Sequence, residues 1–302
     1  MRGLCFKKID AFATEESAGN PAGFIFLERD AELSDMDMLK IAKELKGFVS
    51  EVGYATKIAP DKVKLRYFSS EKEVEFCGHA TVAIMYDLLK EDAELAKCAT
   101  VEIATNRGKL SVENNIASDD CVFVRAPEPI KKQNTLSIDM IAEQLGIEVG
   151  DIKIDLPVEI IDAGLRTLII PMYSLEKVLA VDPDIEVLNN FCRGHEIDII
   201  EIFTQEVANP KNDYRTRVFA ATFGYLEDPA TGSGNSAFGY YLIWHNKWTD
   251  EKVLVIEQSK YEKEYNIVKL KKRKDAQSEW KVYFGGKGIT KIDGTYKLYS
   301  KI

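Results

Sequence analysis

The sequence has no apolar run approaching the roughly 18 residues that a membrane-spanning helix needs. Its first twelve residues also lack the long apolar segment of a signal peptide. Cysteine is scarce, and the five cysteines are odd in number and widely scattered. A chain of this size has no need of disulfides to hold its core together, so we expect reduced thiols. These absences together predict a cytoplasmic protein that does not associate with membranes.

Positive charge is also in deficit. There are 40 lysines and arginines against 49 aspartates and glutamates, a formal net charge of −9. A protein that grips nucleic acid through its phosphates needs an excess of positive charge on one face, so we expect no nucleic-acid partner. One basic run, Lys269 to Lys274, departs from this balance, and its composition predicts a solvated hairpin tip.

The chain has 302 residues, of which 45% are apolar and 29% charged, as in a globular protein of one large or two ordinary domains. Alternating and turn-bounded segments predict strands through both halves of the chain. Ser34 and Ser137 are good N-cap residues for two predicted helices. Residues 126–136 contain two prolines and several polar residues, which makes this stretch the best candidate for a linker.

Two helix starts resemble each other at a spacing of 154 residues, from position 77 to position 231. The matching pairs are Cys77 and Thr231, Gly78 and Gly232, Ala83 and Ala237, Tyr86 and Tyr240, and Leu88 and Leu242. Both helices, at 77–90 and 231–245, are apolar nearly all round and should be enclosed rather than laid on a surface. A repeat of half the chain predicts two similar domains related by a pseudo-twofold axis, each a strand-rich barrel around one apolar helix.

The two helix starts also suggest a binding site. A helix that begins in small residues exposes backbone N–H groups and the positive end of its dipole, which favour an anion. Two such starts at a domain cleft would hold a carboxylate from both sides. The alternative is that the glycines only permit close packing.

Several motifs, in this order along the chain, resemble the PhzF-like (phenazine biosynthesis-like) proteins, which share the fold of the diaminopimelate epimerases. The matching segments are Asp10-Ala11-Phe12, Gly19-Asn20-Pro21-Ala22-Gly23, Ser50-Glu51, Phe76-Cys77-Gly78-His79-Ala80-Thr81 and Glu227-Asp228-Pro229-Ala230-Thr231-Gly232-Ser233. The tail departs from the family, because Gln258-Ser259-Lys260-Tyr261-Glu262-Lys263 stands where a Gln-Gly…Met-Gly-Arg segment is usual.

The resemblance implies an α+β fold of two barrel-like domains, each a strongly curved, mostly antiparallel sheet around a central apolar helix. The expected boundaries are 1–125, joined by the C-terminal strand 288–302, and 126–287, with the active site in the cleft between the domains. The implied activity is cofactor-independent proton transfer on a small carboxylate-bearing metabolite, in a homodimer and without a metal.

The resemblance also assigns roles to individual residues. Glu51 matches the family's general acid/base, and His79 and Asp228 match its polar catalytic partners. The carboxylate-binding positions are matched by Gly78, Gly232 and Ser233, and the pocket-lining asparagine is matched by Asn20.

The residues themselves add two points about the chemistry. Glu51 lies among apolar neighbours, and desolvation there would raise its pKa toward the range useful for moving protons near pH 7. In the related epimerases two cysteines act as a pair of bases. Here Cys77 occupies the first of those positions, but Thr231 occupies the second. A threonine hydroxyl is a far poorer base than a thiolate, which excludes a two-thiol racemase and leaves Cys77 as a small buried packing residue.

Other functions remain as alternatives. A non-catalytic protein that binds a small molecule would keep the fold without needing a desolvated acid. A hydrolase built on Ser233, His79 and Asp228 lacks the G-x-S-x-G pattern. Cys77 and His79 with Cys192 and His195 nominally supply four zinc ligands at unusual spacing. The glycines from Gly232 onward do not have the spacing of a dinucleotide-binding loop.

Overall fold

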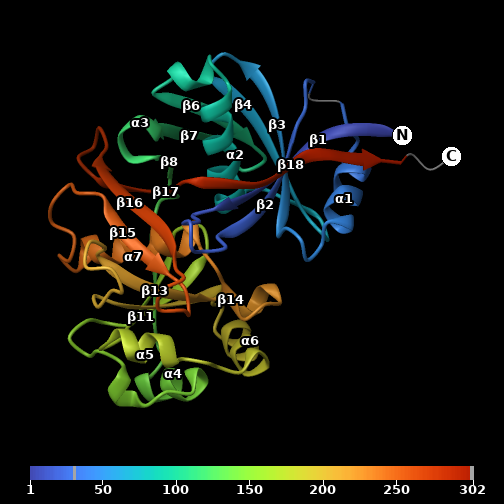
Figure 1. Ribbon diagram of the computed structural model, residues 1–302. Coiled ribbons are helices and arrows are strands. Elements are labelled where there is room, and N and C mark those ends of the chain that lie inside the picture. The colour runs from blue at the N-terminus through green and yellow to red at the C-terminus, as the bar shows by residue number, and fades with distance from the viewer. Residues whose placement is uncertain (30–31, 300–302) are drawn as a thin grey trace. The chain divides into compact units, whose positions relative to one another are not determined.

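The computed structural model describes residues 1–29 and 32–299 and has a mixed α+β fold. The chain divides into two compact units, which Figure 1 colours along the sequence. Unit 1 comprises Met1–Arg125 together with Gly285–Ile302, and unit 2 comprises Ala126–Phe284. Within the described ranges, every helix is too short or too polar to reach across a membrane.

Unit 1 is built on strands that surround one buried helix. In chain order its elements are β1 (Arg2–Ala11), β2 (Asn20–Phe26), α1 (Asp35–Glu44), β3 (Glu51–Ala59), β4 (Lys62–Ser69), β5 (Glu73–Val74), α2 (Gly78–Glu91), a 3₁₀ turn at Leu95–Lys97, β6 (Thr100–Thr105), β7 (Gly108–Asn115), α3 (Ile116–Asp119), β8 (Cys121–Arg125) and β18 (Gly288–Leu298). All ten residues of α2 from Ala80 to Leu89 are buried. The helix contacts β1, β2, β3, β8 and β18, so its apolar surface is enclosed as predicted.

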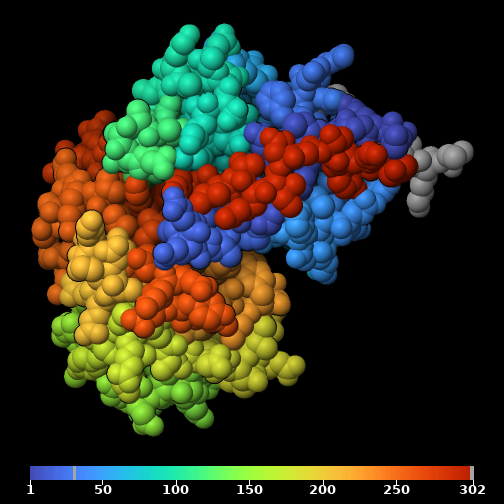
Figure 2. Space-filling view, viewed as in Figure 1, coloured from blue at the N-terminus to red at the C-terminus, as the bar shows by residue number. Residues whose placement is uncertain are grey.

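The strand β18 brings the end of the chain back to its beginning. It pairs antiparallel with β1 over the whole of that strand, from Arg2 opposite Leu298 to Ala11 opposite Gly288. Most of its side chains are exposed, and its residues form part of the surface seen in red in Figure 2.

Unit 2 encloses a second apolar helix. Its elements are β9 (Ile130–Lys132), α4 (Ile138–Leu145), a 3₁₀ turn at Val149–Asp151, β10 (Glu159–Asp162), β11 (Arg166–Pro171), α5 (Leu175–Ala180), α6 (Ile185–Gly194), β12 (Ile199–Thr204), β13 (Tyr214–Phe219), a 3₁₀ turn at Ala221–Phe223, β14 (Glu227–Asp228), α7 (Gly232–Trp244), β15 (Leu254–Gln258), β16 (Asn266–Lys274) and β17 (Trp280–Gly286). Ten residues of α7 are buried, among them Phe238, whose ring lies 4.6 Å from that of Phe203 in β12.

The order of strand pairings is the same in the two halves of the chain. In unit 1, β2 pairs in parallel with β3, and β3 pairs antiparallel with β4. In unit 2, β11 pairs in parallel with β12, and β12 pairs antiparallel with β13. The strand that follows the central helix continues the same order. In unit 1, β4 pairs in parallel with β6, and β6 pairs antiparallel with β7. In unit 2, β13 pairs in parallel with β15, and β15 pairs antiparallel with β16. The repeat predicted from the two helix starts is therefore present in the sheet. The pseudo-twofold relation between the halves stays a prediction.

An ion pair occupies the same place in each repeat. Arg66 in β4 makes two bonds of 2.7 and 2.8 Å to the carboxylate of Glu73 in β5. Arg217 in β13 makes two bonds of 3.0 and 2.9 Å to Glu227 in β14. Each pair ties the strand that precedes a central helix to the short strand leading into it. Bidentate pairing of this kind fixes orientation as well as charge, so it positions the start of each helix.

Local signals in the sequence placed several elements correctly. The hydroxyl of Ser34 accepts from the backbone N–H of Asp37 at the start of α1, and Ser137 does the same for Met140 at α4. The strand β13 ends at Phe219, and the chain then passes into the 3₁₀ turn at Ala221–Phe223. The stretch 126–136 is not wholly a linker, because Ile130–Lys132 pairs with β10.

The prediction for the basic run was wrong. Lys269 to Lys274 belongs to β16 rather than to a hairpin tip, and alternation along the strand sends Leu270 and Lys272 inward. Lys272 is only 2% exposed. Its ammonium lies 5.1 Å from the ring centre of Trp248 and 4.4 Å from that of Trp280. Two indole faces therefore replace water around the ammonium of Lys272. Composition alone does not indicate that a lysine of this run is buried.

Candidate active site

Three chemically reactive side chains of unit 1 form one cluster. Glu51 is the first residue of β3, Cys77 is the N-cap of α2 and His79 is the second residue of that helix. His79 Nε2 lies 3.3 Å from Glu51 Oε2. The Cys77 thiol donates to Glu51 Oε2 at 3.7 Å, and its sulfur lies 3.4 Å from His79 Nδ1. A carboxylate, a thiol and an imidazole therefore lie within reach of one another.

The backbone around Cys77 is held firmly. The Cys77 carbonyl accepts from the Thr81 N–H at 3.0 Å and from the Thr81 hydroxyl at 2.7 Å. The same hydroxyl lies 2.6 Å from the phenol oxygen of Tyr67, which is fully buried in β4. The prediction that Cys77 serves only for packing is incomplete, because its thiol also contacts both Glu51 and His79.

Burial sets the protonation of the histidine. The His79 side chain is 13% exposed, and desolvation lowers its pKa to about 4. At neutral pH the imidazole is therefore uncharged, with one nitrogen that donates and one that accepts. The Glu51 side chain is 22% exposed, so solvent and small molecules can reach its carboxylate.

The pocket-lining asparagine predicted from the family resemblance lies next to this cluster in the sheet. Asn20 is the first residue of β2 and is 2% exposed. Two residues further along β2, Ala22 is the parallel partner of Glu51. The Ser50 N–H donates to the Pro21 carbonyl at 3.1 Å. The strands β2 and β3 therefore begin side by side at the same end of the sheet. The start of α2 lies there too, because Cys77 contacts Glu51.

The predicted site residues of unit 2 gather at the start of α7. Asp228 ends β14, and its Oδ2 accepts from the Thr231 hydroxyl at 2.5 Å. Gly232 and Ser233 are the first two residues of the helix. The meeting of this group with Glu51 and His79 at one cleft stays a prediction.

Gln258, which sequence reasoning missed as a site residue, organises this second group. Its side-chain oxygen accepts from the Thr231 N–H at 3.1 Å and from Asn235 Nδ2 at 2.8 Å. Its nitrogen donates to the Asp228 carbonyl at 2.8 Å and lies 3.1 Å from the Thr231 hydroxyl. Gln258 is marked as important by its complete burial at the end of a strand, and this burial cannot be read from the sequence.

The two central helices differ from α1, α4, α5 and α6 at their N-termini. The side chains of Ser34, Ser137, Ser174 and Asp184 cap α1, α4, α5 and α6, and each of those helices has an acidic residue in its first turn. The N-cap residues of α2 and α7 make no capping bond with their side chains, and neither first turn is acidic. The first N–H groups and the positive dipole end are therefore left for another acceptor.

Packing accounts for one of the glycines predicted to bind substrate. A Cβ atom on Gly232 would lie 2.5 and 2.6 Å from two ring carbons of Phe284, so no larger residue fits there without a shift. The alternative that glycine permits close packing therefore holds at this position. It does not exclude an additional role for the Gly232 backbone.

The four residues weighed as an alternative zinc site, Cys77, His79, Cys192 and His195, do not form one group of possible ligands among the described residues. Within the described residues, the possible metal ligand that lies close to both Cys77 and His79 is Glu51. Cys192 instead belongs to the apolar core of unit 2, and burial raises the pKa of its thiol to about 12.

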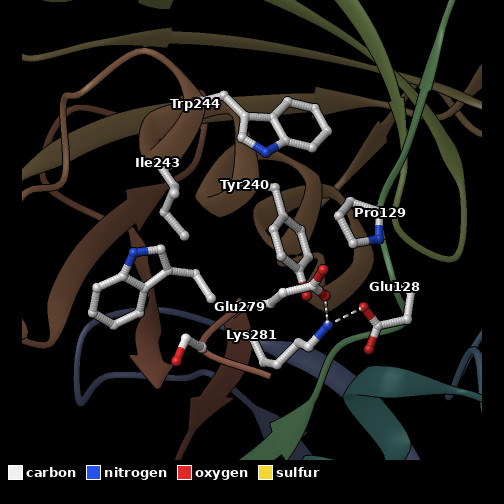
Figure 3. Close-up of a pocket in the computed structure, with 9 residues that line it drawn as sticks. Glu128, Pro129, Tyr240, Ile243, Trp244, Glu279 and Lys281 are labelled. Atoms are coloured by element: carbon white, nitrogen blue, oxygen red, sulfur yellow. Dashed lines mark hydrogen bonds and ion pairs between the residues drawn. The ribbon is translucent and has the colours of Figure 1, made fainter. Parts of the chain in front are cut away.

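A separate pocket lies in unit 2 toward the C-terminal end of α7 (Figure 3). It is lined by Tyr240, Ile243 and Trp244 of the helix, by Trp280 and Lys281 of β17, and by Glu128, Pro129, Ser278 and Glu279. Lys281 Nζ bonds Glu128 at 2.6 Å and Glu279 at 2.9 Å, as the dashed lines show. None of the predicted site residues lines this pocket.

Comparison with known proteins identifies relatives over most of the chain. A family model described as phenazine biosynthesis-like protein, PhzC-PhzF, matches residues 9–294. The chain is 31% identical over 255 residues to the uncharacterized isomerase YfhB of Bacillus subtilis, covering 83% of this chain and 84% of that protein. It is 30% identical over 243 residues to the uncharacterized isomerase YddE of Escherichia coli K12, covering 79% and 78%.

A solved structure supports the fold. The crystal structure of a Bacillus anthracis phenazine biosynthesis protein of the PhzF family superposes with a TM-score of 0.87. The match covers 99% of this chain and 100% of that one at 24% identity.

Proposed function

The chain belongs to the phenazine biosynthesis-like (PhzC-PhzF) family, and we propose that it is an isomerase that moves a proton between positions on a small carboxylate-bearing metabolite. Glu51 is the general acid/base of this reaction, and no cofactor takes part. The observation that carries the proposal is the cluster of Glu51, Cys77 and His79, with Glu51 Oε2 3.3 Å from His79 Nε2. Two relatives that bear the name isomerase support the same reaction class.

The proton-transfer step balances within the substrate and Glu51. The ionised carboxylate removes a proton from a carbon next to the substrate's unsaturated or carboxyl group, and the electron pair of that C–H bond stays on the substrate. Glu51, now protonated, returns a proton to another carbon or to the same one. Neutral His79, whose Nε2 lies 3.3 Å from Glu51 Oε2, adjoins the glutamate without neutralising its charge.

The substrate carboxylate binds at the uncapped start of α2, beginning with Gly78, and the start of α7 at Gly232 and Ser233 offers a second such position. Backbone N–H groups and the helix dipole attract negative charge there. Asp228, held by Thr231, contributes a negative group that suits a hydroxyl or cationic part of the substrate.

Solvent exchange tests the proposal across a range of candidate substrates. We would incubate the protein in D₂O with a set of small unsaturated and hydroxylated carboxylates and follow carbon-bound deuterium by mass spectrometry. An isomerase incorporates deuterium into at least one compound. A protein that only binds its ligand would shift the ligand's NMR signals and incorporate none, which would contradict the proposal.

A further inference from the structure

We propose that Glu51, Cys77 and His79 also form a binding site for a borderline-soft divalent metal ion such as Zn²⁺, whose occupancy blocks proton transfer. The ligand atoms of these three side chains all lie within 4.8 Å of one another. The blocking effect rests on the proposed function, whereas the binding of the ion does not.

Two of the three separations match those between ligands of a tetrahedral zinc site, and the third requires the imidazole to turn. Zinc bonds of about 2.3 Å to sulfur and about 2.0–2.2 Å to nitrogen and oxygen place neighbouring ligand atoms about 3.3–3.6 Å apart. The cluster has 3.3 Å from His79 Nε2 to Glu51 Oε2 and 3.7 Å from Cys77 Sγ to that oxygen. The sulfur lies 3.9 Å from Nε2 and 3.4 Å from Nδ1, so the imidazole ring has to turn until Nε2 points at an ion held by the sulfur.

The ligand chemistry selects the class of ion. A thiolate and an imidazole favour Zn²⁺ and its neighbours over Mg²⁺ or Ca²⁺, which prefer oxygen ligands alone. Binding replaces the Cys77 S–H bond by a metal–sulfur bond and releases the thiol proton to solvent, with no change of oxidation state. The positive end of α2 opposes a cation but stabilises the thiolate. Together the thiolate and the Glu51 carboxylate offset both charges of the ion.

Three side chains leave a fourth coordination position. Glu51 and His79 are partly exposed, so a water molecule or a substrate carboxylate can reach that position. The backbone of Cys77 is held in place by Thr81 and Tyr67, so little order has to be gained when the ion binds. An ion at this place occupies the lone pairs of Glu51 that would otherwise accept the substrate proton.

Cobalt tests the site directly, because a Co²⁺–thiolate bond produces a near-ultraviolet charge-transfer band. Chelator-treated protein would be titrated with Co²⁺, and Zn²⁺ would then be added to displace it. We expect one ion per chain with the band present in the wild type. Cys77→Ser should lose the band, and His79→Gln should bind the ion about tenfold more weakly or worse. Circular dichroism would show that each variant is folded.

Two thiols of unit 1 that reach solvent serve as matched controls. Cys5 is exposed and Cys98 half-buried, and neither belongs to the cluster, so Cys5→Ser and Cys98→Ser should keep the band. Failure of the folded wild type to bind one ion, or a band that persists in Cys77→Ser, would overturn the inference.

Activity separates this inference from the proposed function. Deuterium exchange should stop when one equivalent of Zn²⁺ is bound and return when a chelator removes it. Exchange that continues with the ion bound would overturn the blocking effect. Absence of exchange in the metal-free protein with every carboxylate would instead count against the proposed function, while the cobalt result would stand.

Discussion

At the residue scale, Glu201 in β12 is fully buried in unit 2, and neither carboxyl oxygen has a hydrogen-bond partner among the described residues. The carboxyl group lies against the first turn of α7, where a Cβ atom on Gly234 would be 2.7 Å from Glu201 Oε2. Desolvation raises the pKa of Glu201 well above its usual value. Glu201 therefore keeps its proton to a higher pH than an exposed glutamate does.

This burial predicts the pH dependence of stability. The unfolded chain loses the Glu201 proton near pH 4.3 while the folded chain keeps it. Above that pH the folded state binds more protons, so stability falls with rising pH by up to about 1.4 kcal/mol per unit until the folded pKa is reached. Glu201→Gln should remove this slope and stabilise the protein more at pH 8 than at pH 5.5, as measured by urea unfolding.

The control is Glu15→Gln, which alters an exposed glutamate. The free energy of unfolding of this variant should depend on pH as that of the wild type does. An equal stabilisation by Glu201→Gln at both pH values would show that Glu201 titrates normally and would contradict this assignment.

At the element scale, α7 begins where the backbone must pass close to an aromatic ring. Gly232→Ala would place its Cβ about 2.5 Å from the Phe284 ring. Overpacking of a buried site typically costs about 1–3 kcal/mol. We expect a lower melting temperature for this variant, because both the helix start and the ring are fixed in the core. Gly150→Ala, at a position with no atom within 4 Å of the added carbon, should melt like the wild type. Equal melting of both variants would mean that Phe284 moves aside freely.

At the scale of the whole molecule, the chain leaves unit 1 after Arg125 and returns to it at Gly285. β18 covers β1 along its full length, and Gly288 packs closely on Ile9 and Ala83. A chain ending at Lys287 should therefore expose the edge of β1 and the core around α2. Hydrogen exchange should show loss of protection for the amides of Arg2–Ala11 that bond to β18, whereas the full chain keeps them protected. Unchanged protection in the shortened chain would contradict this role for β18.

How far the sequence predicts this molecule depends on the range of the interactions involved. Ser34 and Ser137 act on their own helices, so the starts of α1 and α4 were predictable from local signals. The contact of Glu51 with His79 depends on the parallel register of β2 with β3 and on the packing of α2. Only the family resemblance associated those two residues with one site.

Other residues were missed for the same reason. Composition places lysine and glutamate at surfaces, so Lys272 between two indoles and Glu201 in the core gave no sign in the sequence. Cys77 was assigned to packing because Thr231 stands where a second cysteine would be. Its contact with Glu51, 26 residues away in the sequence, has no local signal.

The central claim is that Glu51 moves the proton, and the measurement that tests it most directly is the rate of carbon-bound deuterium uptake in Glu51→Gln. This variant keeps the shape of the side chain and removes the group that takes up the proton. The account predicts a fall of about 10²–10⁴-fold against the wild type, a smaller loss in Cys77→Ser, and an unchanged rate in the control Cys98→Ser. Uptake at the wild-type rate in folded Glu51→Gln, or a loss confined to Cys77→Ser, would contradict it.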